Sequence, residues 1–387
     1  MSAEAKQVIL LVDDTPANIQ IALAILKNLY QVRVATNGAR ALELAVTDPL
    51  PDLILLDVMM PGIDGFEVCT QLKASEATRD IPVIFLTGQT EIEDETRGFE
   101  VGGVDYIHKP FSPAVVEARV HTHLVLRGIR ERLAKQLAVM KRELETARQI
   151  QLSILPRAMP KVVGLDVATR YLPMTEVAGD FYDFILVDEN RLGAFVGDVS
   201  GHGTSAALIA SMLKIALAAQ SPVASDPALV LNGLNQALCG KFQGHFITAA
   251  YIFIDTEKKT IRYAGAGHPP LVLQDASTGS ARALEENGLM LGAFPFATYT
   301  SIELPFHEGM WALLYTDGIL EMSNAAGEEF GIDRLTLFAG EHGDASAEIF
   351  VDSLFKRLSQ WDDRHSGPER EDDLTVLAIK FTSPSSA

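Results

Sequence analysis

The sequence SPAVVEARVHTHLVLRGIRERLAKQLAVMKRELETARQIQLSIL, residues 112–155, is the stretch around which the rest of the chain is organised. From residue 133 onward its seam positions alternate steps of four and three residues, and they are Leu133, Leu137, Met140, Leu144, Ala147, Gln151 and Ile154. Charged side chains occupy the neighbouring faces. This heptad pattern predicts a long helix that pairs with another helix along one seam, with Gln151 as the polar member of the seam. The alternative is a single amphipathic helix that lies on a neighbouring domain.

The predicted helix separates two regions of different character. Pro156 and Pro160 follow it and should end it. We therefore expect a first domain over residues 1–125, a coiled-coil linker helix over 126–158 and a second domain over 159–383. Pairing of the linker helices would make the protein a homodimer.

Composition excludes several classes of function. The chain has 387 residues and a formal net charge of −19, which disfavours binding to nucleic acid or to an anionic membrane. Its two cysteines, Cys69 and Cys239, form no metal or disulfide spacing. The N-terminal region lacks a signal-peptide pattern, and the longest later apolar run, residues 206–219, is too short to span a bilayer. We expect a cytoplasmic protein that binds neither nucleic acid nor membrane.

Apolar runs of strand length alternate with helical patterns through the first domain, from residues 8–12 to residues 104–107. This alternation predicts a doubly wound, flavodoxin-like α/β fold, with helices on both faces of a parallel sheet. Polar residues follow the strands at the edge where such folds bind ligands, and they are Asp13, Asp14, Asp57, Thr87 and Lys109. Carboxylates at one edge suit Mg²⁺, and one of them would act as a nucleophile toward a phosphoryl group.

These residues resemble the receiver domain of two-component response regulators over residues 6–125. The matching pieces are the pair Asp13 and Asp14, Asp57 in DVMMPGIDGFE, Thr87, and DYIHKP at residues 105–110. The resemblance implies that a histidine kinase phosphorylates Asp57 and that Asp13, Asp14 and Asp57 bind Mg²⁺. It also implies that Thr87 and Lys109 contact the phosphoryl group, and that Tyr106 rotates on activation.

The second domain carries aspartates at the ends of apolar strands, several of them beside glycine. They occur in VAGDFYDFILV, GDVSGHG, YTDG and EDDLTV, and they include Asp180, Asp198, Asp317 and Asp372. Glycine allows the tight turns and close backbone approach through which such acids converge. An oxygen-only site without clustered histidine or cysteine favours Mg²⁺ or Mn²⁺, and two such ions suit phosphoryl hydrolysis. The alternative is that each aspartate merely caps a loop.

This set resembles the metal-dependent serine/threonine protein phosphatases, in the bacterial branch typified by sporulation protein E and the phosphatase that activates sigma factor B. The further pieces that carry the resemblance, between residues 147 and 381, are ARQIQLSILP, FITAAY, AGHPP, LMLG and EEFG. The resemblance implies an α+β fold in which two antiparallel sheets pack together, with helices outside and the metals at one end between the sheets.

By this resemblance, two Mn²⁺ or Mg²⁺ ions are held by the catalytic aspartates Asp180, Asp198, Asp317 and Asp372 and by the backbone carbonyl of Val199. Asp183 and Asp373 would support these ligands. His202 would either protonate the leaving serine oxygen or have a structural role. Two positions depart from the family pattern, since Ala178 replaces a usual glycine and Gly265 a common asparagine. Both departures affect loop geometry, and neither removes a carboxylate.

Together the two resemblances imply a response regulator whose phosphorylation at Asp57 controls a protein phosphatase through the linker helix. The expected partners are a histidine kinase, a second copy of the chain and a phosphorylated anti-sigma-factor antagonist of a partner-switching stress pathway. The alternative is a catalytically silent phosphatase fold that binds a sigma factor or another partner, which the four intact aspartates disfavour. A nucleotide cyclase or phosphodiesterase output lacks its expected motifs.

Overall fold

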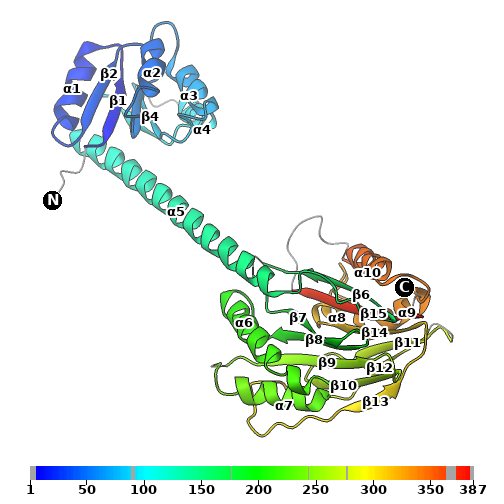
Figure 1. Ribbon diagram of the computed structural model, residues 1–387. Coiled ribbons are helices and arrows are strands. Elements are labelled where there is room, and N and C mark those ends of the chain that lie inside the picture. The colour runs from blue at the N-terminus through cyan, green and yellow to red at the C-terminus, as the bar shows by residue number, and fades with distance from the viewer. Residues whose placement is uncertain are drawn as a thin grey trace. The chain divides into compact units, whose positions relative to one another are not determined.

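The computed structural model of the protein describes residues 6–88, 92–175, 177–242, 244–275, 278–362 and 372–383, and Figure 1 shows its helices and strands. Contacts within the chain divide it into two compact units, Met1–Val139 and Met140–Ala387. Helix α5 (Pro113–Ile154) begins in the first unit and ends in the second. The domain boundaries at residues 125 and 158 stay predictions, since α5 continues across the first and ends before the second.

The first unit contains a parallel sheet with the strand order β2-β1-β3-β4-β5. Its strands are β1 (Val8–Val12), β2 (Gln31–Ala35), β3 (Leu53–Asp57), β4 (Val83–Thr87) and β5 (Asp105–His108). The helices between them are α1 (Pro16–Leu26), α2 (Gly38–Ala45), α3 (Gly65–Ala74) and α4 (Ile92–Glu100). This arrangement confirms the predicted doubly wound α/β fold.

The strands of this sheet send alternate side chains into two separate cores. Leu10 and Val12 of β1 lie in the core that contains Phe66 of α3. Their neighbour Leu11 lies in the opposite core with Val120 of α5. Both faces are therefore apolar, and the strands read as unbroken apolar runs whose polar residues fall at the strand ends.

The second unit contains two antiparallel sheets, ordered β13-β10-β9-β8-β7 and β12-β11-β14-β15-β6. The first sheet consists of β7 (Phe181–Asp188), β8 (Arg191–Val199), β9 (Ile247–Asp255), β10 (Thr260–Ala266) and β13 (Ile302–Pro305). The second consists of β6 (Leu165–Leu172), β11 (Leu271–Asp275), β12 (Ser280–Leu284), β14 (Met310–Tyr315) and β15 (Leu374–Phe381). The predicted two-sheet α+β fold is confirmed.

Helices cover the outer faces of these sheets, as Figure 1 shows. They are α6 (Thr204–Ala218), the 3₁₀ turn η1 (Ser221–Val223), α7 (Pro227–Leu238), α8 (Gly318–Glu321), α9 (Gly331–Glu341) and α10 (Ala347–Trp361). One core joins the two sheets to α6 and α7, and it contains Phe195, Tyr251 and Leu377. A second core packs Trp311 of β14 against Phe350 of α10.

The environment of helix α5 changes along its length. Apolar residues in its middle are about half exposed, and they are Leu126, Ile129, Leu133, Leu137 and Met140. Near its end Gln151 is buried: its Nε2 donates to the carbonyl of Ala178 at 2.6 Å, and its Oε1 accepts from the Ala178 N–H at 3.0 Å. Ile154 packs against the core of the second unit.

The prediction that Gln151 is the polar member of a helix–helix seam is therefore wrong. Its side chain instead hydrogen-bonds the backbone of the second unit in the same chain. This is what the alternative, an amphipathic helix that lies on a neighbouring domain, predicts. Pairing through the exposed middle of the helix stays a prediction. None of the described helices is both long and apolar enough to cross a lipid bilayer.

Candidate functional site

The acidic residues predicted in the first unit come together at the carboxyl ends of β1 and β3. Carboxylate oxygens of Asp13, Asp14 and Asp57 lie within 4.8 Å of one another. Asp13 and Asp57 are buried, whereas Asp14 is exposed. Lys109, which follows β5, places its Nζ 2.7 Å from Asp13 Oδ2 and 2.8 Å from Asp57 Oδ2. Two of the three carboxylates thus share one ammonium group.

The electrostatics of this cluster fit a cation. Burial is the largest effect that raises the pKa of Asp57, and the charge of Asp13 raises it further. The Lys109 side chain opposes both by hydrogen bonding and by its charge. Three acids and one lysine leave an excess of negative charge on oxygen ligands, which is the chemistry that Mg²⁺ prefers. The residues therefore fit the magnesium ion expected in a receiver.

Two further predicted residues lie in the neighbouring strands β4 and β5. Thr87 ends β4 and is largely buried, and its carbonyl accepts from the Lys109 N–H at 2.7 Å. Tyr106 lies in β5, with its ring centroid 5.2 Å from that of the half-exposed Phe99. Asp105, just before Tyr106, contacts Arg119 and His123 of α5, the latter at 3.2 Å. The strand that carries Tyr106 is thus tied to the first part of α5.

Strand register brings the acidic residues of the second unit to one end of the two sheets. Phe181, next to Asp180, pairs with Gly197, next to Asp198. In the other sheet β14 ends at Tyr315, which pairs with Val376 near the start of β15. Asp317 and Asp372 therefore lie at the same end of neighbouring strands. Asp180 is buried, and the other three are partly exposed.

Two glycines allow this close approach. A Cβ atom on Gly179 would lie 2.7 Å from the Val199 carbonyl oxygen and 3.1 Å from Asp198 Oδ1. One on Gly318 would lie 2.2 Å from the Asp373 carbonyl oxygen and 3.2 Å from Asp372 Cβ. Side chains at these positions would push the acidic turns apart. The glycines beside the aspartates in the sequence therefore have a steric reason to be there.

The aspartates raise one another's pKa values. Burial is the largest cause for Asp180, whose pKa lies well above its usual range, and the charge of Asp198 adds to it. Burial and the charges of Asp317 and Asp372 raise the pKa of Asp198 to about 7. Burial is also the main cause that raises the pKa of Asp372 to about 6. Four carboxylates with such mutual repulsion fit divalent cations that bind oxygen. They are gathered more loosely than the receiver acids, which among the described residues are the group whose ligand oxygens all lie within 4.8 Å of one another.

The three supporting residues have different surroundings. Asp373 accepts from the N–H groups of Met174 at 2.7 Å and Gly179 at 2.8 Å, so it fixes the loop that leads into Asp180. Asp183 instead pairs with Lys214 Nζ of α6 at 2.7 Å. His202 is exposed in the turn between β8 and α6.

Two threonines that contact a predicted ligand are not predicted by the sequence patterns. Thr316 and Thr375 are fully buried, and both hydroxyls donate to Asp180 Oδ2, at 2.8 and 2.5 Å. They stand in the motifs YTDG and EDDLTV, one residue before Asp317 and three after Asp372. Adjacency to the aspartates was the available signal. The pattern of strand ends does not show whether a threonine in a strand donates a hydrogen bond to a carboxylate.

One departure from the family pattern has a steric explanation. At Gly265, a Cβ atom would lie 2.8 Å from Asn287 Oδ1, so the Asn287 side chain occupies the space beside this glycine. Asn287 Nδ2 donates to the carbonyl of His268 at 2.7 Å. His268 is buried, and burial lowers its pKa to about 3, so its imidazole is neutral. The other departure, Ala178, is the residue that hydrogen-bonds Gln151.

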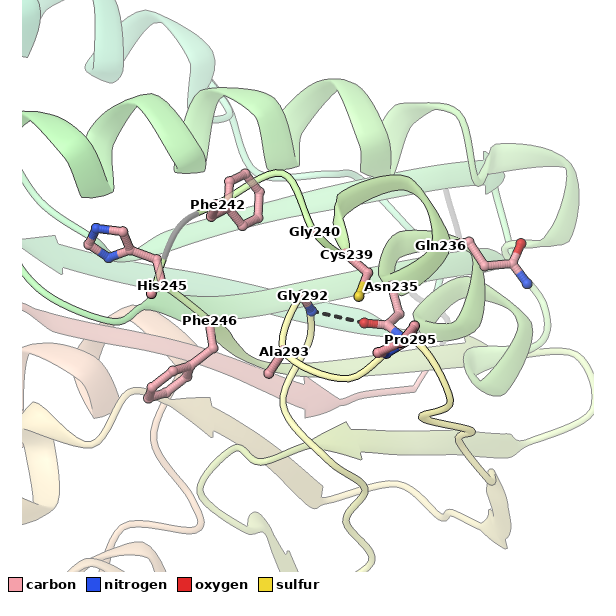
Figure 2. Close-up of a pocket in the computed structure, with 11 residues that line it drawn as sticks. Asn235, Gln236, Cys239, Gly240, Phe242, His245, Phe246, Gly292, Ala293 and Pro295 are labelled. Carbon is pink, nitrogen blue, oxygen red and sulfur yellow. Dashed lines mark hydrogen bonds between the residues drawn. The ribbon is translucent and has the colours of Figure 1, made fainter.

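A cavity of about 780 Å³ lies beside α7 and contains none of the predicted metal ligands. Figure 2 shows its lining, in which the side chain of Asn235 accepts from the Gly292 N–H at 2.8 Å. His245 at its edge hydrogen-bonds the carbonyl of Ser200 at 2.7 Å. The cavity wall therefore holds the turn that follows Asp198 and Val199.

Known families match both units of the chain. The profile of the response regulator receiver domain matches residues 9–121, which contain every predicted receiver residue. The profile of stage II sporulation protein E matches residues 188–382, half of the chain. The chain belongs to the stage II sporulation protein E family. The matched region of this family contains Asp198, Asp317 and Asp372, whereas Asp180 lies just before it.

Two curated relatives and one solved structure are also similar to this chain. Phosphoserine phosphatase RsbP of Bacillus subtilis is 35% identical over 186 residues, 47% of this chain and 46% of RsbP. Phosphoserine phosphatase RsbU of Bacillus subtilis is 28% identical over 259 residues, 67% of this chain and 73% of RsbU. The SiaA-PP2C domain of Pseudomonas aeruginosa shares the fold, with a TM-score of 0.58 and 24% identity over 64% of this chain and 99% of that domain. The chain spans from 26% to 73% of the length of the first curated relatives that it matches.

Proposed function

We propose that this chain is a response regulator in which phosphorylation of Asp57 controls a Mn²⁺- or Mg²⁺-dependent phosphoserine and phosphothreonine protein phosphatase. One observation carries the proposal, namely the convergence of four aspartates from two sheets into a single acidic site beside close-packed glycines. Family membership supports it, as does similarity to RsbP and RsbU, which are both named as phosphoserine phosphatases.

The proposed catalytic ligands are Asp180, Asp198, Asp317 and Asp372, with the carbonyl of Val199. When bound, two divalent ions would lower the pKa of a water and neutralise charge on the phosphoryl group. Asp373 keeps the loop before Asp180 in place through its two backbone hydrogen bonds. We assign to His202, exposed after the Asp198 turn, the donation of a proton to the leaving serine or threonine oxygen.

In the receiver, the Asp57 carboxylate would attack a phosphoryl group supplied by a histidine kinase and become an acyl phosphate. Asp13, Asp14 and Asp57 would hold Mg²⁺ there. Lys109 already contacts two of these carboxylates, and its ammonium group would pair with the new phosphoryl oxygens together with the hydroxyl of Thr87. Tyr106 would report the change by moving against Phe99.

Helix α5 is the proposed link between the two activities. Within the first unit it binds Asp105, the neighbour of Tyr106, through Arg119 and His123. Within the second unit Gln151 holds both backbone groups of Ala178, two residues before Asp180. A shift or rotation at the receiver end of one continuous helix would therefore change the backbone that carries a proposed metal ligand.

The exposed apolar stripe of α5 supports the proposed homodimer. Its five members are Leu126, Ile129, Leu133, Leu137 and Met140, and they recur at steps of three and four residues. A stripe of this spacing on a solvated helix matches the seam of a coiled coil. We propose that a second copy of α5 covers it.

We propose a phosphorylated anti-sigma-factor antagonist as the substrate. RsbP and RsbU are the relatives that support a partner-switching pathway. Dephosphorylation would let the antagonist capture an anti-sigma factor and release a sigma factor.

The test is hydrolysis of p-nitrophenyl phosphate with Mn²⁺ by the full chain, with and without beryllofluoride on Asp57. Asp317→Asn should lower turnover by roughly 100-fold, because it removes one proposed ligand. Asp344→Asn, the same change at an exposed acid in the turn before α10, is the matched control and should be neutral. Beryllofluoride should change the turnover of wild type and of the control alike.

Equal turnover in Asp317→Asn and wild type would refute the proposed site. Absence of turnover on both p-nitrophenyl phosphate and phosphoserine peptides, together with metal-independent binding of a protein partner, would favour the catalytically silent adaptor. A turnover that does not change when beryllofluoride is added would show that the receiver does not control the phosphatase.

A further inference from the structure

A buried hydrogen-bond network connects the two sheets at Asp180. Thr316 follows β14 and Thr375 lies in β15, both in the second sheet, while Asp180 precedes β7 of the first sheet. Thr316 and Thr375 have no exposed surface, and Asp180 is 2% exposed. Both hydroxyl groups reach the same carboxylate oxygen, Oδ2, at 2.8 Å and 2.5 Å.

The direction of these hydrogen bonds is fixed by a third one. The backbone N–H of Thr375 donates to Thr316 Oγ1 at 3.1 Å, so the hydroxyl hydrogen of Thr316 must point elsewhere. A hydroxyl has one hydrogen, and the nearby acceptor is Asp180 Oδ2. Backbone bonding between Thr316 N–H and the Thr375 carbonyl at 3.1 Å holds the two residues in register.

The two hydroxyl donors on Oδ2 affect how the other carboxylate oxygen, Oδ1, can be used. Each carboxylate oxygen offers about two lone-pair directions. The hydroxyl donors fill those of Oδ2, so a cation would bind Asp180 through Oδ1, the oxygen that receives no threonine hydroxyl.

We infer that Thr316 and Thr375 are positioning residues that orient Asp180 so that it binds a divalent cation through Oδ1 alone. The inference rests on the proposed phosphatase function. It assigns the threonines to the metal site through Asp180, and neither of them touches substrate. Loss of such an outer partner typically weakens metal binding or activity by about 10- to 100-fold.

A purely structural role is the competing explanation. In that case the threonines would only join the two sheets, and removing a hydroxyl would lower stability while leaving metal affinity unchanged. The two roles differ in what calorimetry and melting experiments measure, because the first role predicts a change in Mn²⁺ affinity among molecules that are folded.

The experiment uses the full chain and measures Mn²⁺ binding by isothermal titration calorimetry, melting temperature in EDTA, and Mn²⁺-dependent turnover. The variants are Thr375→Ala and Thr316→Ala, which remove the hydroxyl without placing a methyl group against Oδ2, and Thr375→Ser, which keeps the hydroxyl. Thr169→Val, on the neighbouring strand β6, is the control for loss of a partly buried hydroxyl.

We expect Thr375→Ala and Thr316→Ala to weaken Mn²⁺ binding by about 10- to 100-fold, while Thr375→Ser and Thr169→Val bind as wild type does. Wild-type Mn²⁺ affinity in both alanine variants, whatever their melting temperatures, would overturn the inference. If one alanine variant does not fold, the other decides. Failure of the wild type itself to bind Mn²⁺, with Asp317→Asn giving the same trace, would instead refute the proposed phosphatase function.

Discussion

Alanine in place of Gly318 should separate two of the proposed metal ligands. The new Cβ atom would stand 2.2 Å from the carbonyl oxygen of Asp373, which is roughly 1 Å closer than non-bonded atoms approach. Because that oxygen belongs to the backbone, no side-chain rotation relieves the overlap. Either the turn that follows Asp317 or the one that follows Asp372 must move.

Two effects of opposite sign act on stability. Gly318 begins helix α8, where alanine is favoured over glycine by about 1 kcal/mol. Overlap in a packed site costs about 1–3 kcal/mol, so we expect a small net loss of stability and a melting temperature lower by a few degrees. Activity should change far more, since a displacement of about 1 Å at reacting groups costs on the order of 100-fold in rate.

The assay is Mn²⁺-dependent hydrolysis of p-nitrophenyl phosphate, with the melting temperature measured on the same samples. Gly128→Ala is the matched control, because Gly128 lies in helix α5 with no atom within 4 Å of an added Cβ. The control should gain up to about 1 kcal/mol of helix stability and keep its turnover. A Gly318→Ala enzyme with turnover within about threefold of wild type would refute the steric reasoning.

Other predictions follow from single contacts. Lys109→Met removes the ammonium group 2.8 Å from Asp57 Oδ2, so beryllofluoride should no longer change phosphatase turnover; a retained response would contradict the role of Lys109. Leu137→Glu places a charge in the exposed stripe of α5 and should shift the chain from dimer to monomer in light scattering, whereas Ala138→Glu, one residue off the stripe, should not. Burial raises the pKa of Cys69 to about 11, so native protein at pH 8 should react with iodoacetamide at the cavity residue Cys239 and not at Cys69, and peptide mass spectrometry showing equal labelling would contradict this.

Much of the fold can be predicted from the sequence, because buried strands appear in it as short apolar runs. In the first unit, strands buried on both faces read as VILLV and VIFLT, and their polar residues stand where the chain leaves the sheet. The strand pattern alone therefore predicts that Asp13 and Asp57 are neighbours. The second unit is predictable for a different reason, since two of the predicted ligands, Asp180 and Asp317, stand beside glycines that close packing demands, Gly179 and Gly318.

Contacts between the two sheets of the second unit cannot be predicted from strand patterns or from neighbouring glycines. Thr316 and Asp180 are 136 residues apart, and the direction in which a strand threonine points depends on register. Asn287, which fills the space beside Gly265, comes from a loop that has no periodic pattern. Local sequence predicts which residue types gather at a strand end. It does not say which of them donate a hydrogen bond to which oxygen.

Gln151 illustrates the same limit for a helix. A heptad pattern predicts that the side chains along one stripe of the helix are buried or hydrogen-bonded. Either a partner helix or a domain of the same chain can bury that stripe, so the pattern does not distinguish them. In α5 the pattern is continuous, yet Leu133 is half exposed while Gln151 is buried against Ala178. The seam is thus exposed in its middle and packed on the second unit near its end. If the exposed part pairs as proposed, a change in that pairing would act on the same helix that holds the backbone before Asp180, which is the property that the proposed control of the phosphatase site by the receiver requires.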